Sequence, residues 1–176
     1  MRPGARPTVQ VRRIMESDLE AFRELRLRAL ATDPMAFGDT LEGEQKAEES
    51  GWRDWVRRSS SLDDAITFLA STSEGPLVGM LGSVWKEGVT WLGAMWVDPR
   101  FRGLGTGGLL LDSVLAWSDS IHAGSEVRLY VAPAQEAAIR LYRGRGFVTT
   151  GKDFHPEHAP RAVFHEMLRA PKSTPS

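Results

Sequence analysis

Apolar residues alternate with polar ones near the start of the chain and then recur at helical spacing. The alternation around Val9 and Val11 predicts a first strand. A helix is expected to follow, capped by Ser17 or Asp18 and ending near Ala31. Its apolar positions repeat every two to four residues: Leu19, Phe22, Leu25, Leu27 and Leu30.

A second helical pattern comes after an interruption. Pro34 and Gly38 break the periodicity between residues 32 and 49, and we expect a loop there. The spacing resumes at residue 52 and predicts a helix that ends before the serines at 59–61. The apolar positions of this helix are Trp52, Trp55 and Val56.

Three extended segments follow, at residues 65–71, 77–85 and 89–97. The turns that separate them, at residues 75–76 and 87–88, are too short to hold a crossover helix. The three segments are therefore predicted to pair as antiparallel neighbours.

The second half of the chain alternates helical and extended patterns. A glycine-rich turn leads into a helix with apolar residues from 109 to 117, and a strand is expected at 127–131. A helix at 137–143 and a last strand at 163–168 complete the order. Antiparallel hairpins followed by a strand, helix and strand crossover predict an α/β (α+β) fold with a mixed sheet.

Length and composition fit one domain over residues 1–176, with little order expected at 1–7 and 170–176. The chain has no cysteine, which excludes disulfides and a thiol nucleophile, and its histidines show no metal-ligand spacing. A net charge of −1 offers no footprint for nucleic acid. No apolar run is long enough to span a membrane, and we expect a soluble, cytoplasmic protein.

The sharpest chemical signal is the turn at residues 102–108. Four glycines lie within six residues, between a strand and an amphipathic helix. Glycine allows positive φ and close approach to a ligand, and a helix start offers N–H groups without intrahelical partners. The turn is therefore expected to hold an anion.

Three anion-binding patterns compete for this turn. A phosphate-binding P-loop would need Lys and then Ser or Thr after the last glycine, where two leucines stand. Gly103, Gly105 and Gly108 satisfy the dinucleotide pattern G-x-G-x-x-G, but no acidic residue ends the next strand to bind a ribose. The third pattern, R-x-x-G-x-G at residues 102–107, is that of a turn that grips the pyrophosphate of coenzyme A.

With this turn and a second motif, the chain resembles the Gcn5-related N-acetyltransferase (GNAT) family over nearly its whole length. The second motif is A-I-R-L-Y-R-G-R-G-F at residues 138–147, which is similar to the family's A-I-x-L-Y-x-x-x-G-F segment. The resemblance implies a mainly antiparallel sheet, splayed near the cofactor and flanked by helices. It also implies transfer of the acetyl group of acetyl-CoA to a primary amine by direct attack, without a metal.

The resemblance further implies which residues take part. Backbone groups of Met95, Trp96 and Val97 would pair with the pantetheine arm and polarise the thioester. Tyr142 would be the general acid that protonates the departing thiolate, and Gln135 stands where the family often has Asn beside the cofactor. The pyrophosphate would be held by the turn, formed by Arg102, Gly103, Leu104, Gly105, Thr106, Gly107 and Gly108.

No residue stands out as the general base that takes a proton from the amine. Asp39, Glu42 and Glu44, in the loop expected after the first helix, are candidates, and a bound water is another. His155 and His158 lie in a segment expected to border the acceptor.

The acceptor itself is left open between a polyamine, an antibiotic, an amino acid, a peptide N-terminus and a lysine side chain. Trp52, Trp55 and Trp85 are candidates to line its cleft, although their spacing also suits a core. The alternative to an enzyme is a non-catalytic acyl-CoA-binding module or sensor with the same turn. The resemblance is also compatible with a homodimer.

Overall fold

The computed structural model describes residues 8–172 apart from residues 62, 74 and 158. Residues 1–7 and 173–176, where we expected little order, lie outside this part, and residues 170–172 belong to no helix or strand. The elements are β1 (Val9–Arg13), α1 (Leu19–Thr32), α2 (Leu41–Lys46), α3 (Glu49–Ser60), β2 (Ala65–Thr72), β3 (Leu77–Lys86), β4 (Val89–Val97), α4 (Thr106–Ile121), β5 (Glu126–Val131), α5 (Glu136–Arg143), β6 (Val148–Phe154) and β7 (Phe164–Arg169).

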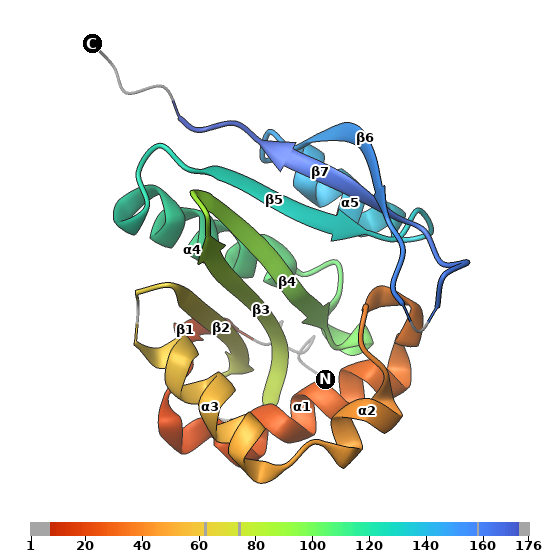
Figure 1. The fold of residues 1–176 in the computed structure, drawn as a ribbon. Coiled ribbons are helices and arrows are strands. Elements are labelled where there is room, and N and C mark those ends of the chain that lie inside the picture. Colours follow the sequence, from red (N-terminus) through yellow and green to blue (C-terminus); the bar gives the residue numbers. More distant parts are fainter. Residues whose placement is uncertain (1–7, 62, 74, 158, 173–176) are drawn as a thin grey trace, which may run out of the picture.

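The described strands form one seven-stranded sheet in the order β1-β2-β3-β4-β5-β7-β6. The pairs β2–β3 and β3–β4 are antiparallel, as expected from their short turns. The other neighbouring strands are also antiparallel, except that β4 and β5 are parallel and joined through α4. The prediction of a mixed, mainly antiparallel sheet flanked by helices is confirmed (Figure 1).

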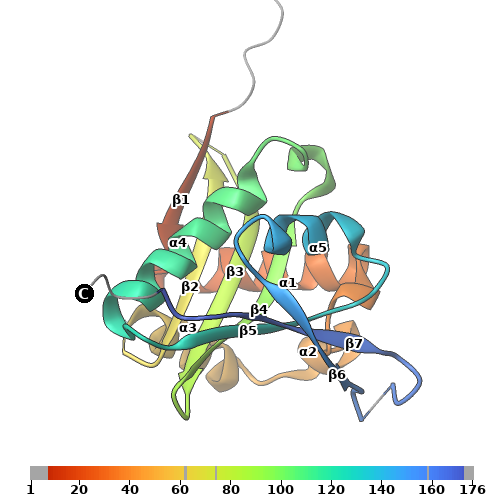
Figure 2. The same cartoon turned by 90° about the horizontal axis from the view of Figure 1, so that it is seen from above.

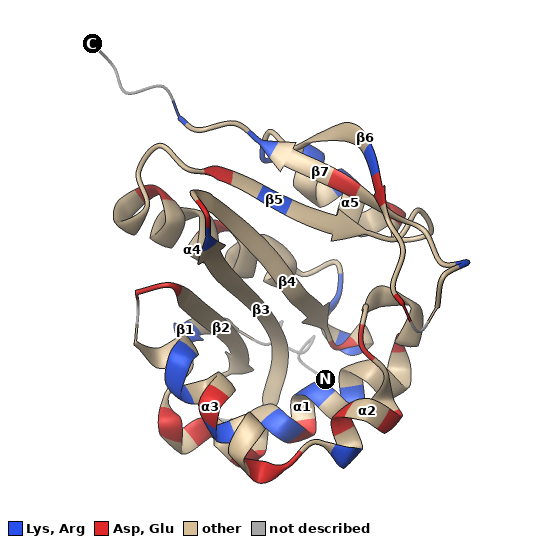
Figure 3. Cartoon of the chain, viewed as in Figure 1, with Lys and Arg blue, Asp and Glu red and all other residues tan. Residues whose placement is uncertain are grey.

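Helices cover both faces of the sheet and bury two separate cores. On one face α4 packs on β2, β3 and β4, around Leu110, Leu111 and Val114 (Figure 2). On the other, α1 and α3 bury Phe22 and Trp52. Figure 3 shows charged residues along α1, α2 and α3 and few in the middle of β2, β3 and β4. The strands in the middle of the sheet are therefore apolar on both sides, as expected for a sheet between two layers of helices.

The sheet opens between β4 and β5. The two strands pair from Val89–Glu126 to Leu92–Leu129 and no further, although β4 continues to Val97. Figure 1 shows them close together at their starts and diverging toward their ends. Ala94, just after the last pair, has a positive φ of 56°, and the pairing of β3 with β4 shifts register at the same place. The expected splay thus consists of a bulge in β4 and the end of the hydrogen-bonded pairing between β4 and β5.

Three local expectations were wrong. Residues 41–46 form helix α2 rather than a loop, since the Thr40 side chain accepts a hydrogen bond from the Gly43 N–H and caps it. Helix α3 runs through residues 59 and 60, because Ser59 is buried and bonded to Thr67 on β2. Strand β6 was not anticipated, since all of its residues are exposed and its sequence has no apolar alternation.

Candidate active site

A cavity of about 420 Å³ runs through the opening between β4 and β5. Trp96, which belongs to the core under α1 and α3, lines it from one face of the sheet. Leu141 and Tyr142 of α5 line it from the other face. A narrow ligand can therefore pass from the α4–α5 side of the sheet toward the α1–α3 side.

The glycine-rich turn forms one end of this cavity. Gly103 and Gly105 have φ values of 71° and 86°, which residues with a Cβ rarely adopt. Gly105 is the N-cap of α4, so the helix begins immediately at Thr106. The first N–H groups of a helix have no intrahelical acceptor and lie at the positive end of its dipole. This end of the cavity is suited to an anion.

The next two glycines are required by close packing. A Cβ at Gly107 would come 3.1 Å from Cε of Met95 and 3.3 Å from a methyl group of Leu141, so it would narrow the cavity. A Cβ at Gly108 would lie 2.8 Å from a guanidinium nitrogen of Arg145, which is held by Asp112. The four glycines thus serve two purposes, since two shape the turn and two allow side chains of neighbouring elements to lie against α4.

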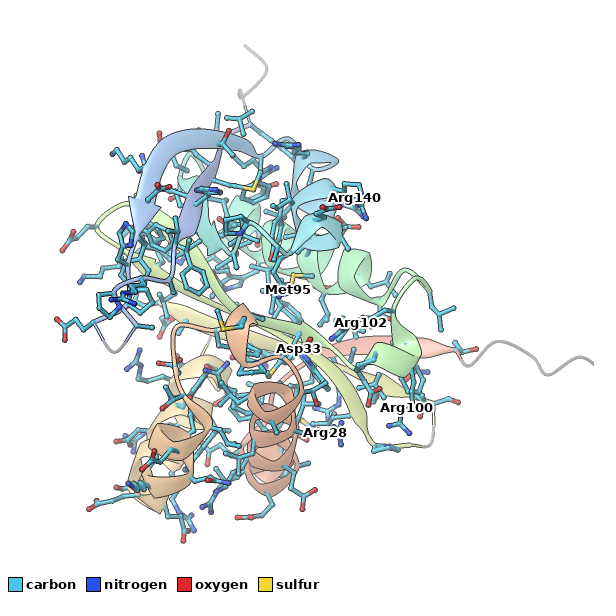
Figure 4. All side chains as sticks on the ribbon, turned by 90° about the vertical axis from the view of Figure 1, so that its right-hand side faces the viewer. Arg28, Asp33, Met95, Arg100, Arg102 and Arg140 are labelled. Atoms are coloured by element: carbon cyan, nitrogen blue, oxygen red, sulfur yellow. The ribbon has the colours of Figure 1, made fainter. Side chains whose placement is uncertain are left out.

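Arg102 ties the turn to the rest of the molecule. Its guanidinium donates to the Val97 carbonyl at 2.8 Å and to the carboxylate of Asp33 at 2.5 Å. Asp33, at the end of α1, also accepts a hydrogen bond from the indole of Trp96 at 2.7 Å. Figure 4 shows Arg102 and Asp33 side by side, with Met95 toward the side of α5, where Arg140 lies. The charge of Arg102 is therefore already balanced, and its side chain fixes the turn against β4 and α1.

Tyr142 contributes a phenol to the lining of the cavity. It is 6% exposed, and its hydroxyl lies 3.0 Å from the sulfur of Met95 on β4. Burial raises the pKa of the phenol well above its ordinary value. The group therefore stays protonated over the whole physiological range and is available as a proton donor.

The structure brings most of the predicted cofactor residues together. Leu104 is 40% exposed and does not line the cavity. The sequence analysis missed Asp33 and Ala36, which also line it, because nothing local marks residues so distant in sequence. The predicted residues that line the cavity are Met95, Trp96, Val97, Arg102, Gly103, Gly105, Thr106, Gly107, Gly108, Gln135 and Tyr142.

The candidate bases are not gathered at the cavity. Glu42 is paired with Lys46 on the surface of α2, and Glu44 is bonded to the buried guanidinium of Arg26. Asp39 also accepts a hydrogen bond from the guanidinium of Arg26. His155 is exposed and lines neither of the two cavities of the described residues, and His158 lies outside those residues.

The tryptophans singled out in the sequence divide between different sites. Trp52 is in the core, Trp55 borders a second cavity, and Trp85 stacks on His122 at the far end of the sheet. No described helix is long and apolar enough to cross a membrane. Within the described ranges, no three His, Asp or Glu side chains are placed to bind a metal together.

Comparison with known proteins gives consistent results. The model of the acetyltransferase (GNAT) family matches residues 19–147. The mycothiol acetyltransferase of Thermobispora bispora is 32% identical over 145 residues, which make up 74% of this chain and 43% of that protein. The chain thus spans less than half the length of this curated relative.

Solved structures share the fold at low identity. A GNAT-family acetyltransferase from Streptococcus pneumoniae superposes with a TM-score of 0.76 at 20% identity, covering 93% of this chain and 99% of that one. The PaiA N-acetyltransferase of Thermoplasma acidophilum, solved with coenzyme A, gives 0.72 at 18% identity, covering 93% and 99%. Taken with the family match over most of its length, the split sheet and the glycine turn, these results show that the chain belongs to the GNAT family of acetyltransferases.

Proposed function

We propose that the protein transfers the acetyl group of acetyl-CoA to a primary amine by direct attack of the amine on the thioester. The observation that carries this proposal is the cavity through the split sheet, with a helix N-terminus at one end and Tyr142, bonded to Met95, in its lining. An elongated thioester with a charged pyrophosphate fits such a cavity, since its anionic part meets the turn and its thin pantetheine arm enters the split. PaiA, which shares the fold, was solved with coenzyme A.

Each part of the site has one task in this reaction. The turn from Gly103 to Gly108 holds the pyrophosphate through main-chain N–H groups. The end of β4 has lost its partner strand beyond Leu92, so backbone groups of Met95 to Val97 are available to the pantetheine amides and to the thioester carbonyl, apart from the Val97 carbonyl, which accepts from Arg102. Arg102 keeps the turn and the end of β4 in register through its bond to Val97.

The chemical step needs a proton donor for sulfur and a proton acceptor for nitrogen. The neutral amine forms the N–C bond as the C–S bond breaks, and the nitrogen releases one proton. Tyr142 gives its proton to the departing thiolate and regains one from water, into which the amine releases its own. Tyr142 is protonated when the thiolate forms, and the burial that raises its pKa also makes it a weaker acid than a free phenol.

No carboxylate among the described residues that line the first cavity is free to act as a base toward the amine, since Asp33 is bonded to Arg102 and to the Trp96 indole. Tyr130 lies where the two cavities meet, and burial, together with the nearby carboxylate of Glu166, raises the pKa of its phenol, so it is a poor acceptor of protons at neutral pH. The amine therefore reacts from its uncharged fraction. We expect kcat/KM to rise with pH until the pKa of the free amine, near 10 for an alkylamine, is passed.

A calorimetric titration with acetyl-CoA, run beside NADH, is the first test. We expect binding of acetyl-CoA and none of NADH, and a stabilisation of about 2.7 kcal/mol at a hundredfold excess over Kd. Release of free thiol with a panel of amines then distinguishes an enzyme from an acyl-CoA-binding sensor. No binding of acetyl-CoA would remove the proposal, and binding without thiol release for any amine would favour the sensor.

A further inference from the structure

A second and larger cavity, of about 730 Å³, lies on the α1–α3 side of the opening. It shares Ala36, Leu92, Gly93, Ala94 and Tyr130 with the first cavity. The two spaces therefore meet at the bulge of β4, where the proposed function puts the thioester. A volume in this range holds a small organic molecule. On that function, which the inference presupposes, the second cavity takes the acceptor.

One side of this cavity is a wall of aromatic rings, which we call the aromatic wall: Trp91, Tyr130, Phe154 and Phe164. Tyr130 of β5 is stacked against Trp91 of β4 at 5.3 Å between centroids and against Phe154 of β6 at 5.0 Å. Phe154 in turn contacts Phe164 at 6.4 Å. Tyr130 and Phe154 are each 41% exposed, so part of their ring surface is accessible to a ligand.

The opposite side is also aromatic. The guanidinium of Arg26 lies between the rings of Phe37 and Trp55, at 4.7 and 5.4 Å from their centroids. Arg26 lines the cavity but is only 1% exposed; its guanidinium donates to Asp39 at 2.7 Å and to Glu44 at 3.0 Å, while its Nη1 has no hydrogen-bond partner among the described residues. A ligand between the two sides is thus in contact mainly with rings.

The charges that border the cavity disfavour a polycationic acceptor. Asp39 is occupied by Arg26, and Asp54 is paired with Arg57 at 2.7 Å. Arg58, which also borders the cavity, has no ionic partner among the residues that the structure describes. A polyamine would need carboxylates free to pair with its ammonium groups, whereas here the unpaired charge is positive.

We propose that the acceptor is a primary amine that carries an aromatic ring a few bonds from its nitrogen. The ring lies against the aromatic wall and the nitrogen reaches Gly93 and Ala94, where the cavities meet. Aromatic rings in contact gain from offset stacking beyond the area they bury. Phe154, which borders the second cavity and not the first, is a specificity-determining residue in this arrangement.

The test compares 2-phenylethylamine with ethylamine and spermidine, by thiol release from acetyl-CoA. We expect kcat/KM for 2-phenylethylamine to exceed that of the other two amines at least tenfold. Spermidine or ethylamine used as well as the aryl amine would overturn the inference and leave the proposed function in place. Acetyl-CoA binding without turnover of the aryl amine also overturns it, and no acetyl-CoA binding shows that the proposed function itself has failed.

Variants at the aromatic wall test whether the wall causes the preference for the aryl amine. Phe154→Ala is expected to raise KM for 2-phenylethylamine at least fivefold and leave KM for acetyl-CoA unchanged. Val148→Ala is the matched control, because Val148 is an exposed apolar residue of the same strand that borders neither cavity. Phe154→Leu, which keeps most of the volume, is used if the alanine variant does not fold. An unchanged KM for the aryl amine in a folded Phe154 variant contradicts the proposal.

Discussion

The two cavities differ in which parts of the chain line them. Nine of the residues that line the first cavity, four of them glycines, come from one stretch of the chain, residues 95–108, and most of the others come from β5, the loop after it and α5. The second is formed by side chains from the loop at 36–39, α3, and strands β2 to β7. A phosphate-containing ligand common to many enzymes can be held by main-chain groups, whereas an acceptor particular to one enzyme must be recognised by side chains. The contrast predicts that backbone changes damage the donor side and side-chain changes the acceptor side.

Gly107→Val gives the largest expected effect. The Cβ of a valine at this position would lie 3.1 Å from Met95 and 3.3 Å from Leu141, so the side chain narrows the first cavity and displaces its neighbours. We expect acetyl-CoA affinity to fall at least a hundredfold in calorimetry, with the circular dichroism spectrum retained. Gly51→Val on α3 is the control, since a Cβ there meets no described atom within 4 Å. Retained affinity in Gly107→Val would remove the turn from the donor site.

Tyr142→Phe tests the chemistry without disturbing the cavity. Loss of the proton donor is expected to lower kcat at least tenfold, with KM for acetyl-CoA little changed. The chain has two tyrosines. Tyr130→Phe is the matched control, because the Tyr130 hydroxyl lies 3.5 Å from Glu166, whereas the Tyr142 hydroxyl contacts the sulfur of Met95. We expect less than a threefold change in kcat there. Equal losses in the two variants would contradict the assignment of Tyr142.

The same tyrosine affects stability at high pH. Its pKa is raised on folding, so the folded chain keeps a proton that the unfolded chain loses above pH 10. The contribution is complete below pH 10 and declines by at most about 1.4 kcal/mol for each pH unit above it. Urea unfolding between pH 9 and 11 should therefore show a steeper loss for the wild type than for Tyr142→Phe. Parallel curves would mean that the phenol is not buried as described.

Asp33→Asn gives the smallest expected effect. Asn keeps an acceptor for the Trp96 indole and removes the ionic partner of Arg102. The ion pair is partly exposed, so we expect the free energy of unfolding to fall by about 0.5–1 kcal/mol. Acetyl-CoA affinity should change by less than tenfold in the same calorimetric titration. A loss as large as that of Gly107→Val would mean that Asp33, and not the turn alone, holds the donor.

The segments with strong periodicity were predicted well, and those without it were not. Helix α1 buries one face and strand β4 contributes to the cores on both sides of the sheet, so their apolar residues mark them in the sequence. Strand β6 buries nothing and forms through hydrogen bonds to β7, which no local pattern reveals. Helix α2 is a single short segment whose charged side chains pair with one another and with Arg26. Its formation depends on that buried arginine as much as on its own sequence.

Within the candidate site the same division appears. The turn and Tyr142 were predicted because each lies in a contiguous motif, and the structure brings them to one cavity. Asp33 was not predicted, because its bond to Arg102 joins residues 69 positions apart. The aromatic wall was missed for the same reason, since its rings come from β4, β5, β6 and β7.

The sequence alone determined the order of the elements other than α2 and β6, the glycine turn and the family resemblance, and that resemblance implied Tyr142 as the general acid, which stays a prediction. Those features depend on residues close together in the chain, where spacing fixes geometry. The tertiary structure decided where the sheet opens, that Arg102 is neutralised by Asp33, and that four rings from separate strands meet beside the bulge at Ala94. Such contacts depend on strand register and on which side chains are buried together, and neither quantity can be read from neighbours in sequence.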